Sequence, residues 1–178
     1  KPGESRLMLL NLAPGKNRLG GSALAQVLSQ IGDESPDVDD STLLANGFKA
    51  IQKMIKENLI LSCHDRSDGG LITTLAEMAM GGNCGIKITI TKEEELITFL
   101  FSEELGWVLE YLPENAAEIT AMLKYFAVPF MLLGDTQKKR RFLIKRDDDV
   151  VLDIGIPTLL SWWEVTSDRL EKEQMNPE

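Results

Sequence analysis

Short apolar runs that suit β-strands alternate along this chain with stretches whose apolar residues recur every three or four positions, as they do in helices. Residues 7–12 (LMLLNL) and 59–63 (LILSC) are largely apolar runs, whereas residues 86–90 (IKITI) alternate as a half-exposed strand does. Residues 41–58 and 70–80 have helical spacing. Because the two kinds of element are interleaved, we expect a sheet covered by helices.

The rest of the chain adds elements of both kinds. We predict helices at residues 22–31, 92–100, 113–127 and 157–173, strands at 106–111 and 129–133, and a hairpin from 141–145 and 150–153. A hairpin and several short connections do not suit a purely doubly wound sheet. The predicted fold class is therefore α+β, with a mixed β-sheet packed with helices in a single domain of residues 1–170. The polar residues 171–178 are predicted to begin a linker.

Three of the predicted helices carry apolar faces that we expect to lie in the core. Ser22 is the predicted N-cap of the first of them. The two tryptophans of the last helix are expected to form a core seam rather than a ligand site. The apolar residues are Leu24, Val27, Leu28 and Ile31 in the first helix, Leu44, Phe48, Ile51 and Ile55 in the second, and Leu159, Trp162, Trp163 and Leu170 in the last.

Charge and composition exclude several classes of protein. The chain has 19 lysines and arginines against 28 aspartates and glutamates, a net charge of -9, so we expect no binding to nucleic acid. No apolar run approaches the roughly 18 to 20 residues that span a bilayer, so no membrane segment is expected. Two cysteines, Cys63 and Cys84, make neither a disulfide framework nor a zinc site, which favours a reducing cytoplasm. We expect both thiols to be buried and inert.

The segment that best suits chemistry joins the predicted strand 59–63 to the predicted helix 70–80. A strand-to-helix junction presents free N–H groups and the positive end of the helix dipole, which suits a phosphate. Gly69 and Gly70 allow close approach, Ser67 offers a hydroxyl, and Asp65 and Asp68 offer the hard oxygens that Mg²⁺ prefers. The alternative is structural: Asp68 caps the helix and the glycines make the turn.

Other polar residues favour structural roles. His64, the one histidine, has no visible partner cluster, so we expect an ordinary hydrogen-bonded side chain. Glu103 and Glu104 are adjacent, and adjacent residues do not share a face of a helix or strand, so capping or solvation is expected. The Gly20-Gly21 turn lacks the pattern of a phosphate-binding loop and is a weak candidate.

Five longer motifs occur in order along the chain: LGGSALAQV at 19–27, HDRSDGGL at 64–71, LAEMA at 75–79, GNCGI at 82–86 and FSEELG at 101–106. With these motifs the chain resembles a known family, the phosphoribosylformylglycinamidine synthases of the large, single-chain type. Motifs this long, in this order, are far more specific than one glycine-rich loop. Further matching segments at residues 129–134, 163–167 and 176–178 extend the resemblance to nearly the whole chain.

The resemblance implies a function and a place in a larger enzyme. The family's members are ATP- and glutamine-dependent ligases of purine synthesis, with a glutamine amidotransferase domain. They convert the amide of formylglycinamide ribonucleotide to an amidine, by phosphorylating the amide oxygen and displacing the phosphate with ammonia. This chain would be the second C-terminal-type domain of the aminoimidazole ribonucleotide synthetase superfamily, ahead of the glutaminase domain. Its partners would be the remaining domains, ATP and formylglycinamide ribonucleotide.

Carried over to this sequence, the family pattern implies that Asp65 binds Mg²⁺ and Ser67 contacts ATP, with Gly69 a weaker ATP contact. It gives Glu103 and Glu104 no role. Neither cysteine corresponds to the glutaminase nucleophile, and the chain by itself is expected to be inactive. Two alternatives stay open: a domain of another ATP-using member of the superfamily, such as aminoimidazole ribonucleotide synthetase, or a scaffolding module without a ligand.

Overall fold

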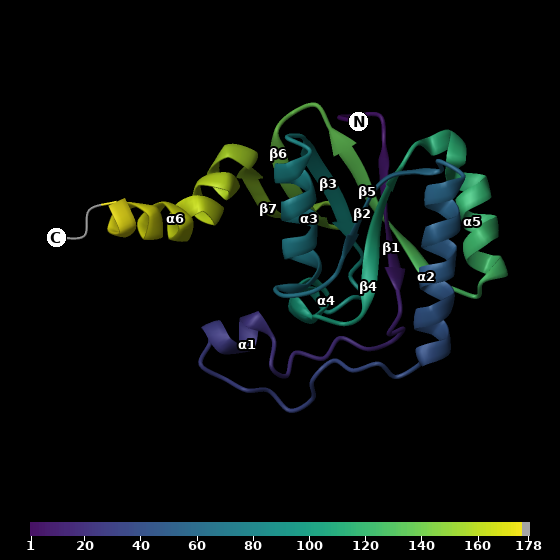
Figure 1. The fold of residues 1–178 in the computed structure, drawn as a ribbon, viewed down its shortest axis with the longest axis horizontal. Helices are drawn as coiled ribbons and strands as arrows, with labels where there is room; N and C mark the ends of the chain where they lie inside the picture. Colours follow the sequence, from purple (N-terminus) through teal and green to yellow (C-terminus); the bar gives the residue numbers. More distant parts are fainter. Residues whose placement is uncertain (176–178) are drawn as a thin grey trace.

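A seven-stranded mixed sheet runs through the centre of the computed structural model, which describes residues 1–175 (Figure 1). The strand order is β2-β4-β1-β5-β3-β6-β7. All neighbouring pairs are antiparallel except β3 with β6. The strands are β1 (Arg6–Asn11), β2 (Ile60–Asp65), β3 (Gly85–Ile90), β4 (Gly106–Tyr111), β5 (Phe130–Gln137), β6 (Arg141–Arg146) and β7 (Asp149–Gly155).

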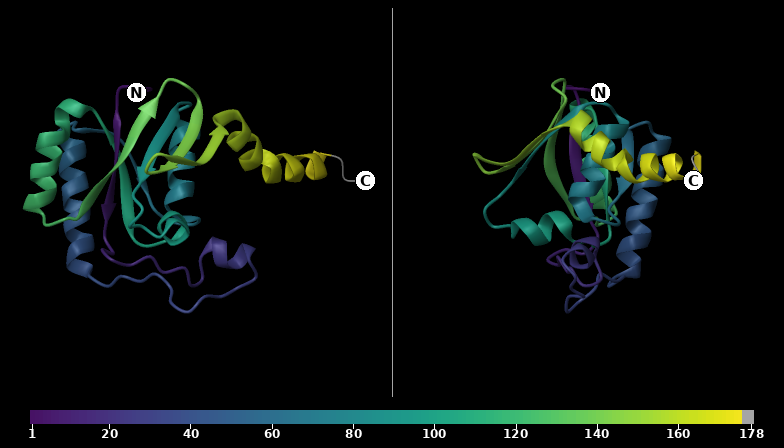
Figure 2. Two further views of the ribbon diagram at one scale, coloured as in Figure 1. Left: turned by 180° about the vertical axis from the view of Figure 1, so that it is seen from behind. Right: turned by 90° about the vertical axis from the view of Figure 1, so that its left-hand side faces the viewer.

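Helices cover both faces of this sheet. Figure 1 places α2 and α5 on one side, α3 and α4 on the other, and α1 in a long excursion between β1 and α2. In Figure 1 and in the left-hand view of Figure 2, α6 projects from the domain. The helices are α1 (Ala23–Val27), α2 (Ser41–Lys56), α3 (Gly70–Gly81), α4 (Leu96–Phe101), the 3₁₀ turn η1 (Pro113–Asn115), α5 (Ala116–Tyr125) and α6 (Ile156–Met175).

Strand β1 divides the apolar side chains between two cores. Leu7 and Leu9 point into the core beneath α3 and α4, and Met8 and Leu10 point into the core beneath α2 and α5. All four are at most 1% exposed because β1 lies between β4 and β5 and is covered on both faces. The α+β prediction is therefore confirmed.

The predicted elements are present, with shifted bounds. The hairpin of β6 and β7 forms around Asp147, whose φ is +50°, and β3 buries its three isoleucines while alternating with Lys87 and Thr89. Helix α6 continues to Met175, and the predicted linker residues 176–178 lie outside the described part of the chain. The domain boundary at residue 170 stays a prediction.

The predicted helix over residues 22–31 is wrong in its length. Ser22 does cap α1, but the helix ends at Val27, and Ser29 has a left-handed φ of +55°. A left-handed residue ends the run of helical hydrogen bonds, so the apolar spacing does not continue as a helix. As a result Val27, Leu28 and Ile31 are exposed rather than buried.

Two further apolar faces are predicted correctly only in part: Ile51 of α2 is buried and Leu159 of α6 packs against the core, but other members of each face are exposed. In α2 the stripe that packs on the sheet includes Gly47, Ala50 and Met54, so Phe48 and Ile55 face outward. Small residues are favoured at this contact because they allow the helix to approach the sheet closely. In α6, Trp162 and Trp163 are 61% and 56% exposed and do not form a core seam, because the helix leaves the domain after Ile156. None of the helices in residues 1–175 has the length and hydropathy needed to cross a membrane.

The central position of β1 leads to a stability prediction. Leu9→Ala should lower the free energy of unfolding by about 3 kcal/mol, because it removes a fully buried side chain that the two flanking strands cannot move to replace. Urea unfolding followed by circular dichroism measures the change. The control, Val27→Ala, removes an 81% exposed side chain and should change the free energy by less than about 0.5 kcal/mol. Equal losses would contradict this assignment of the core.

Candidate functional site

The loop after β2 leaves the sheet where the last pair, Asp65 with Trp107, is made. The side chain of Asp65 is 65% exposed and Ser67 is also exposed, while Gly69 is half-buried. Gly69 is the N-cap of α3, with φ +81° and no side-chain cap. The alternative in which Asp68 caps the helix is therefore wrong.

Gly70 brings this loop directly against the segment before β4. Its φ is +73°, and a Cβ at this position would lie 2.6 Å from the carbonyl carbon of Phe101 and 2.7 Å from the carbonyl oxygen of Ser102. A side chain is thus excluded both by the backbone conformation and by the neighbouring backbone. The glycine pair makes the turn and also lets the two segments touch.

Arg66 anchors the loop from inside. It is 4% exposed, its backbone N–H donates to the Gly106 carbonyl at 2.8 Å, and its guanidinium donates to the carbonyls of Glu104 and Leu105. Burial lowers the pKa of Arg66 to about 10, and the Glu104 carboxylate opposes that change. The guanidinium stays charged at neutral pH, and its hydrogen bonds hold the loop on the start of β4.

Glu103 has a role that adjacency in sequence did not reveal. Its Oε1 accepts hydrogen bonds from the backbone N–H groups of Gly69 and Ala23, each at 2.8 Å. These N–H groups lie at the starts of α3 and α1, where helices leave donors without intrahelical partners. Capping or solvation was expected for Glu103 and Glu104. In the structure, the Glu103 carboxylate caps the starts of two helices.

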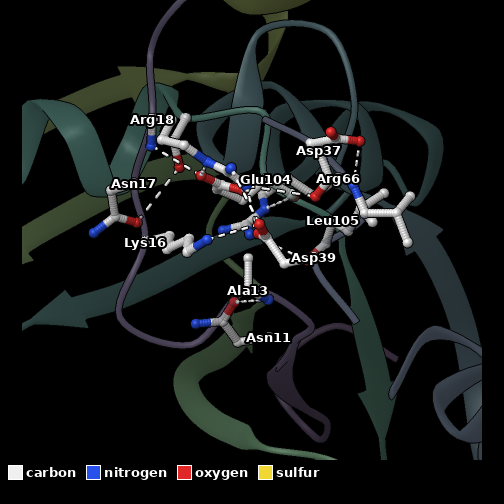
Figure 3. Close-up of polar contacts among 12 residues, drawn as sticks. Asn11, Ala13, Lys16, Asn17, Arg18, Asp37, Asp39, Arg66, Glu104 and Leu105 are labelled. Atoms are coloured by element: carbon white, nitrogen blue, oxygen red, sulfur yellow. Dashed lines mark hydrogen bonds and ion pairs between the residues drawn. The ribbon is translucent and has the colours of Figure 1, made fainter. Parts of the chain in front are cut away.

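Glu104 is fully buried and is paired with Arg18 (Figure 3). Arg18 donates to Glu104 from its backbone N–H at 3.0 Å, from Nε at 2.7 Å and from Nη2 at 2.8 Å. Asp39 extends the network, lying 2.8 Å from Arg18 Nη2 and 2.7 Å from Lys16 Nζ. The solvation role considered for Glu104 is therefore wrong.

The environment of Glu104 decides its charge. Burial alone would raise the pKa of this carboxyl, but the hydrogen bonds from Arg18 and the positive charges of Arg18 and Arg66 outweigh burial and hold the pKa below its ordinary value. Glu104 is therefore ionised near neutral pH. A buried charge that is paired in this way fixes the geometry of the groups around it.

A groove of about 670 Å³ lies beside this network and is lined by residues including Lys16, Arg18 and Gly20. The Gly20 backbone N–H donates to the Glu34 carbonyl at 2.7 Å, and a Cβ on Gly20 would overlap that carbonyl. The Gly20-Gly21 turn is therefore used for packing of the loop. Asp65 and Ser67 do not line this groove.

The remaining candidates have structural partners. His64 Nε2 lies 3.0 Å from Glu77 Oε2 and its Nδ1 lies 2.8 Å from the Asp65 carbonyl, which confirms an ordinary hydrogen-bonded histidine. Cys84 is buried as expected, but Cys63 is exposed because β2 is an edge strand. Both thiols are free.

The donor set around Asp65 suits part of a magnesium site. Within residues 1–175, no group of three or more histidine, cysteine, aspartate or glutamate side chains is placed to hold a metal ion. Mg²⁺ is commonly held by one or two carboxylates together with phosphate oxygens and water, so one exposed carboxylate beside a phosphate is a reasonable contribution. Asp65 fits that role, and the other ligands would come from outside its loop.

Sequence reasoning found the loop but missed the residues that hold it. Arg18 lies outside every quoted motif, and nothing in the motifs that contain Arg66 and Glu104 shows that these two charged side chains are buried. The signal available was the charge of Glu104 within FSEELG, between apolar residues that enter a strand. A charge in such a place needs a partner, but the sequence does not say that the partner is Arg18.

The buried pair predicts a pH dependence of stability. Glu104→Gln should lower the free energy of unfolding at pH 7 by about 2 kcal/mol, because Arg18 loses one carboxylate but keeps Asp39. Since the pKa of folded Glu104 is depressed, the wild-type advantage should be complete above its ordinary value of 4.5 and fade as the pH falls below it. Urea unfolding between pH 7 and pH 3 measures this. Glu57→Gln, at an exposed pair with Lys53, should leave the free energy of unfolding almost unchanged. A loss equal to that of Glu104→Gln would contradict a special contribution of the buried pair.

The glycine contact predicts a second change. Gly70→Ala should lower the free energy of unfolding by about 3 kcal/mol, because it combines a left-handed backbone with overlap on residues 101–102. Gly81→Ala is the matched control in the same helix: its added Cβ meets no atom within 4 Å, so it should be neutral or stabilising by about 0.5 kcal/mol. Thermal unfolding measures both changes. Equal melting temperatures for the two variants would contradict the close contact of Gly70 with residues 101–102.

Comparisons with known proteins identify the family of this chain. Residues 4–145 match the model of the AIR synthase related protein, C-terminal domain. The chain is 39% identical to a phosphoribosylformylglycinamidine synthase of Dictyostelium discoideum over 193 residues, covering 98% of this chain and 14% of that protein. It is 43% identical to a probable chloroplastic/mitochondrial phosphoribosylformylglycinamidine synthase of Arabidopsis thaliana over 169 residues, covering 94% of this chain and 12% of that protein.

Solved structures share the fold. Thermotoga maritima PurL complexed with ATP superposes with a TM-score of 0.68 at 16% identity, covering 89% of this chain and 26% of that chain. The same protein complexed with FGAR gives a TM-score of 0.70 at 16% identity, covering 89% and 28%. The family match covers most of the sheet and the whole of the loop from Asp65 to Gly70. The chain belongs to the family of the C-terminal domain of AIR synthase related proteins.

Proposed function

We propose that this chain is one domain of a phosphoribosylformylglycinamidine synthase and that its loop from Asp65 to Gly70 contributes to an ATP and magnesium site. The observation that carries the proposal is the exposed pair of Asp65 and Ser67, on a loop whose backbone is fixed from beneath by buried Arg66. The identity to synthases from two organisms supports the parent enzyme, and the solved complexes of PurL with ATP and with FGAR support its ligands.

The proposed reaction is the ATP-dependent conversion of the amide of formylglycinamide ribonucleotide to an amidine. The amide oxygen attacks the terminal phosphorus of ATP and ADP leaves; ammonia then adds to the carbon, and phosphate leaves with that oxygen. A bound Mg²⁺ would neutralise charge on the phosphates. Asp65 would hold this ion through its carboxylate, and the Ser67 hydroxyl would donate a hydrogen bond to a phosphate oxygen.

Gly69 takes a more limited part in this proposal. Its N–H is already engaged by Glu103, so its proposed contribution is the open approach that a residue without a side chain gives to ATP. Asp68 is exposed and does not cap α3, and it is proposed neither as a metal ligand nor as an ATP contact.

The other parts of the reaction belong to partners. The chain spans 12 to 14% of the length of the curated relatives it matches, and the proposal assigns glutamine hydrolysis and the remaining substrate contacts to other domains of the enzyme. A purified chain of these residues would then have no complete activity. We also propose a cytoplasmic location on the basis of two free cysteines; the name of the Arabidopsis relative makes an organelle the alternative.

The test of the site is Asp65→Asn in the full-length protein. Turnover with ATP, formylglycinamide ribonucleotide and ammonium should fall by about a hundredfold, and more magnesium should be needed for half-maximal rate, because a neutral amide binds the ion poorly. Folding should be unchanged, since the side chain is 65% exposed. Asp148→Asn, an exposed residue in the turn between β6 and β7, is the control and should keep full activity. Wild-type turnover and magnesium dependence in Asp65→Asn would refute the assignment.

A further inference from the structure

We propose that Glu103 is a positioning residue that holds the loop from Asp65 to Gly70 and the turn from Gly20 to Ala23 in one fixed arrangement. One carboxylate oxygen of Glu103 accepts from Gly69 N–H and from Ala23 N–H, each at 2.8 Å. The two donors are far apart in the sequence and lie at the starts of two different helices, α3 and α1. The inference rests on the proposed function, because the loop from Asp65 to Gly70 that Glu103 holds is the proposed ATP and magnesium loop.

The chemistry of the two donors explains why a carboxylate is used. Gly69 has no side chain with which to cap α3, so the helix start lacks a local hydrogen-bond acceptor. At α1, Ser22 accepts from Ala25 N–H at 3.2 Å and leaves the Ala23 N–H for another partner. Both donors lie at the positive ends of helices, where an anionic acceptor forms stronger hydrogen bonds than a neutral one.

The neighbours of Glu103 keep its backbone in place. Ser102 and Glu104 are both fully buried, and Glu104 is held by Arg18. On the preceding side, the backbone of residues 101–102 packs against the Cα of Gly70. Glu103 therefore extends from a rigid segment, and its side chain transfers that rigidity to the loops on either side.

Within the loop, Gly69 would serve to anchor the backbone and Asp65 and Ser67 would serve to contact the ligand. Because Glu103 already engages the Gly69 N–H, the start of α3 is held whether or not a phosphate is bound. Asp65 and Ser67 then present their oxygens from a loop that is ordered before the nucleotide arrives. Preordering of this kind lowers the entropy lost on binding, and its removal should appear mainly in the apparent affinity for ATP.

The experiment compares Glu103→Ala with Glu103→Gln in the full-length protein. Hydrogen exchange measured by mass spectrometry on peptides covering residues 66–71 and 20–25 reports the two loops, and steady-state kinetics report KM for ATP and kcat. Glu103→Ala should increase exchange in both peptides together and raise KM for ATP about tenfold, with a smaller change in kcat. Glu103→Gln keeps an oxygen acceptor and should restore most of both properties. Glu57→Ala, on the exposed end of α2, is the control and should change neither.

Each other outcome overturns the inference. If exchange is unchanged in both peptides of Glu103→Ala, Glu103 does not hold either segment. If exchange is faster in only one peptide, Glu103 does not couple the two segments. Faster exchange in both with an unchanged KM for ATP overturns the positioning role. Asp65→Asn distinguishes failure of the positioning role from failure of the proposed function. If Asp65→Asn loses turnover while Glu103→Ala keeps the wild-type KM for ATP, the nucleotide site is supported and the positioning role is wrong. If Asp65→Asn is fully active, the nucleotide site itself is wrong.

Discussion

The ion pair between Arg18 and Glu104 is the interaction on which the arrangement of the loops depends. A carboxylate that is fully buried would be costly by several kcal/mol without a partner, so the fold would be much less stable without Arg18. Arg18 meets that requirement with three donors, and Arg66 adds a second positive charge nearby. The excursion that carries Arg18 is thereby tied to the segment entering β4. The loop from Asp65 to Gly70 is tied to the same segment through Arg66.

The strands and most helices were predictable because their information is local. Alternation in β3, the apolar run of β1 and the turn before β7 each specify an element within a few residues. The faces of helices were less predictable. Spacing identifies an apolar stripe, but a close contact can select Gly47 and Ala50 instead of Phe48, and a helix such as α6 can leave the domain with Trp162 exposed. Both outcomes depend on how elements pack, which a single helix does not encode.

Some features of the candidate site were likewise predictable from the sequence, and others were not. Residues 65–70 form a strand-to-helix junction whose glycines and polar side chains are visible in the sequence, and the structure places them in such a loop. The supports of the loop are not visible in the sequence, because Glu103 and Glu104 contact residues 34 to 86 positions away. Contacts over such separations leave no periodic pattern. Only the unusual cost of burying a charge indicates that some partner must exist.

The central place of β1 also has a consequence for the order of events during synthesis. This strand is made first, but its partners β4 and β5 include residues as late as Asp135. At about 5 to 20 residues per second, the ribosome needs roughly 6 to 25 seconds to complete them after β1 emerges. Until β4 is made at residues 106–111, Leu7 to Leu10 have neither of their two partner strands, and until β5 is made one edge of β1 stays unpaired. Folding of the domain must therefore wait for its C-terminal half, and a chaperone that shields an extended apolar segment would protect the nascent chain from aggregation.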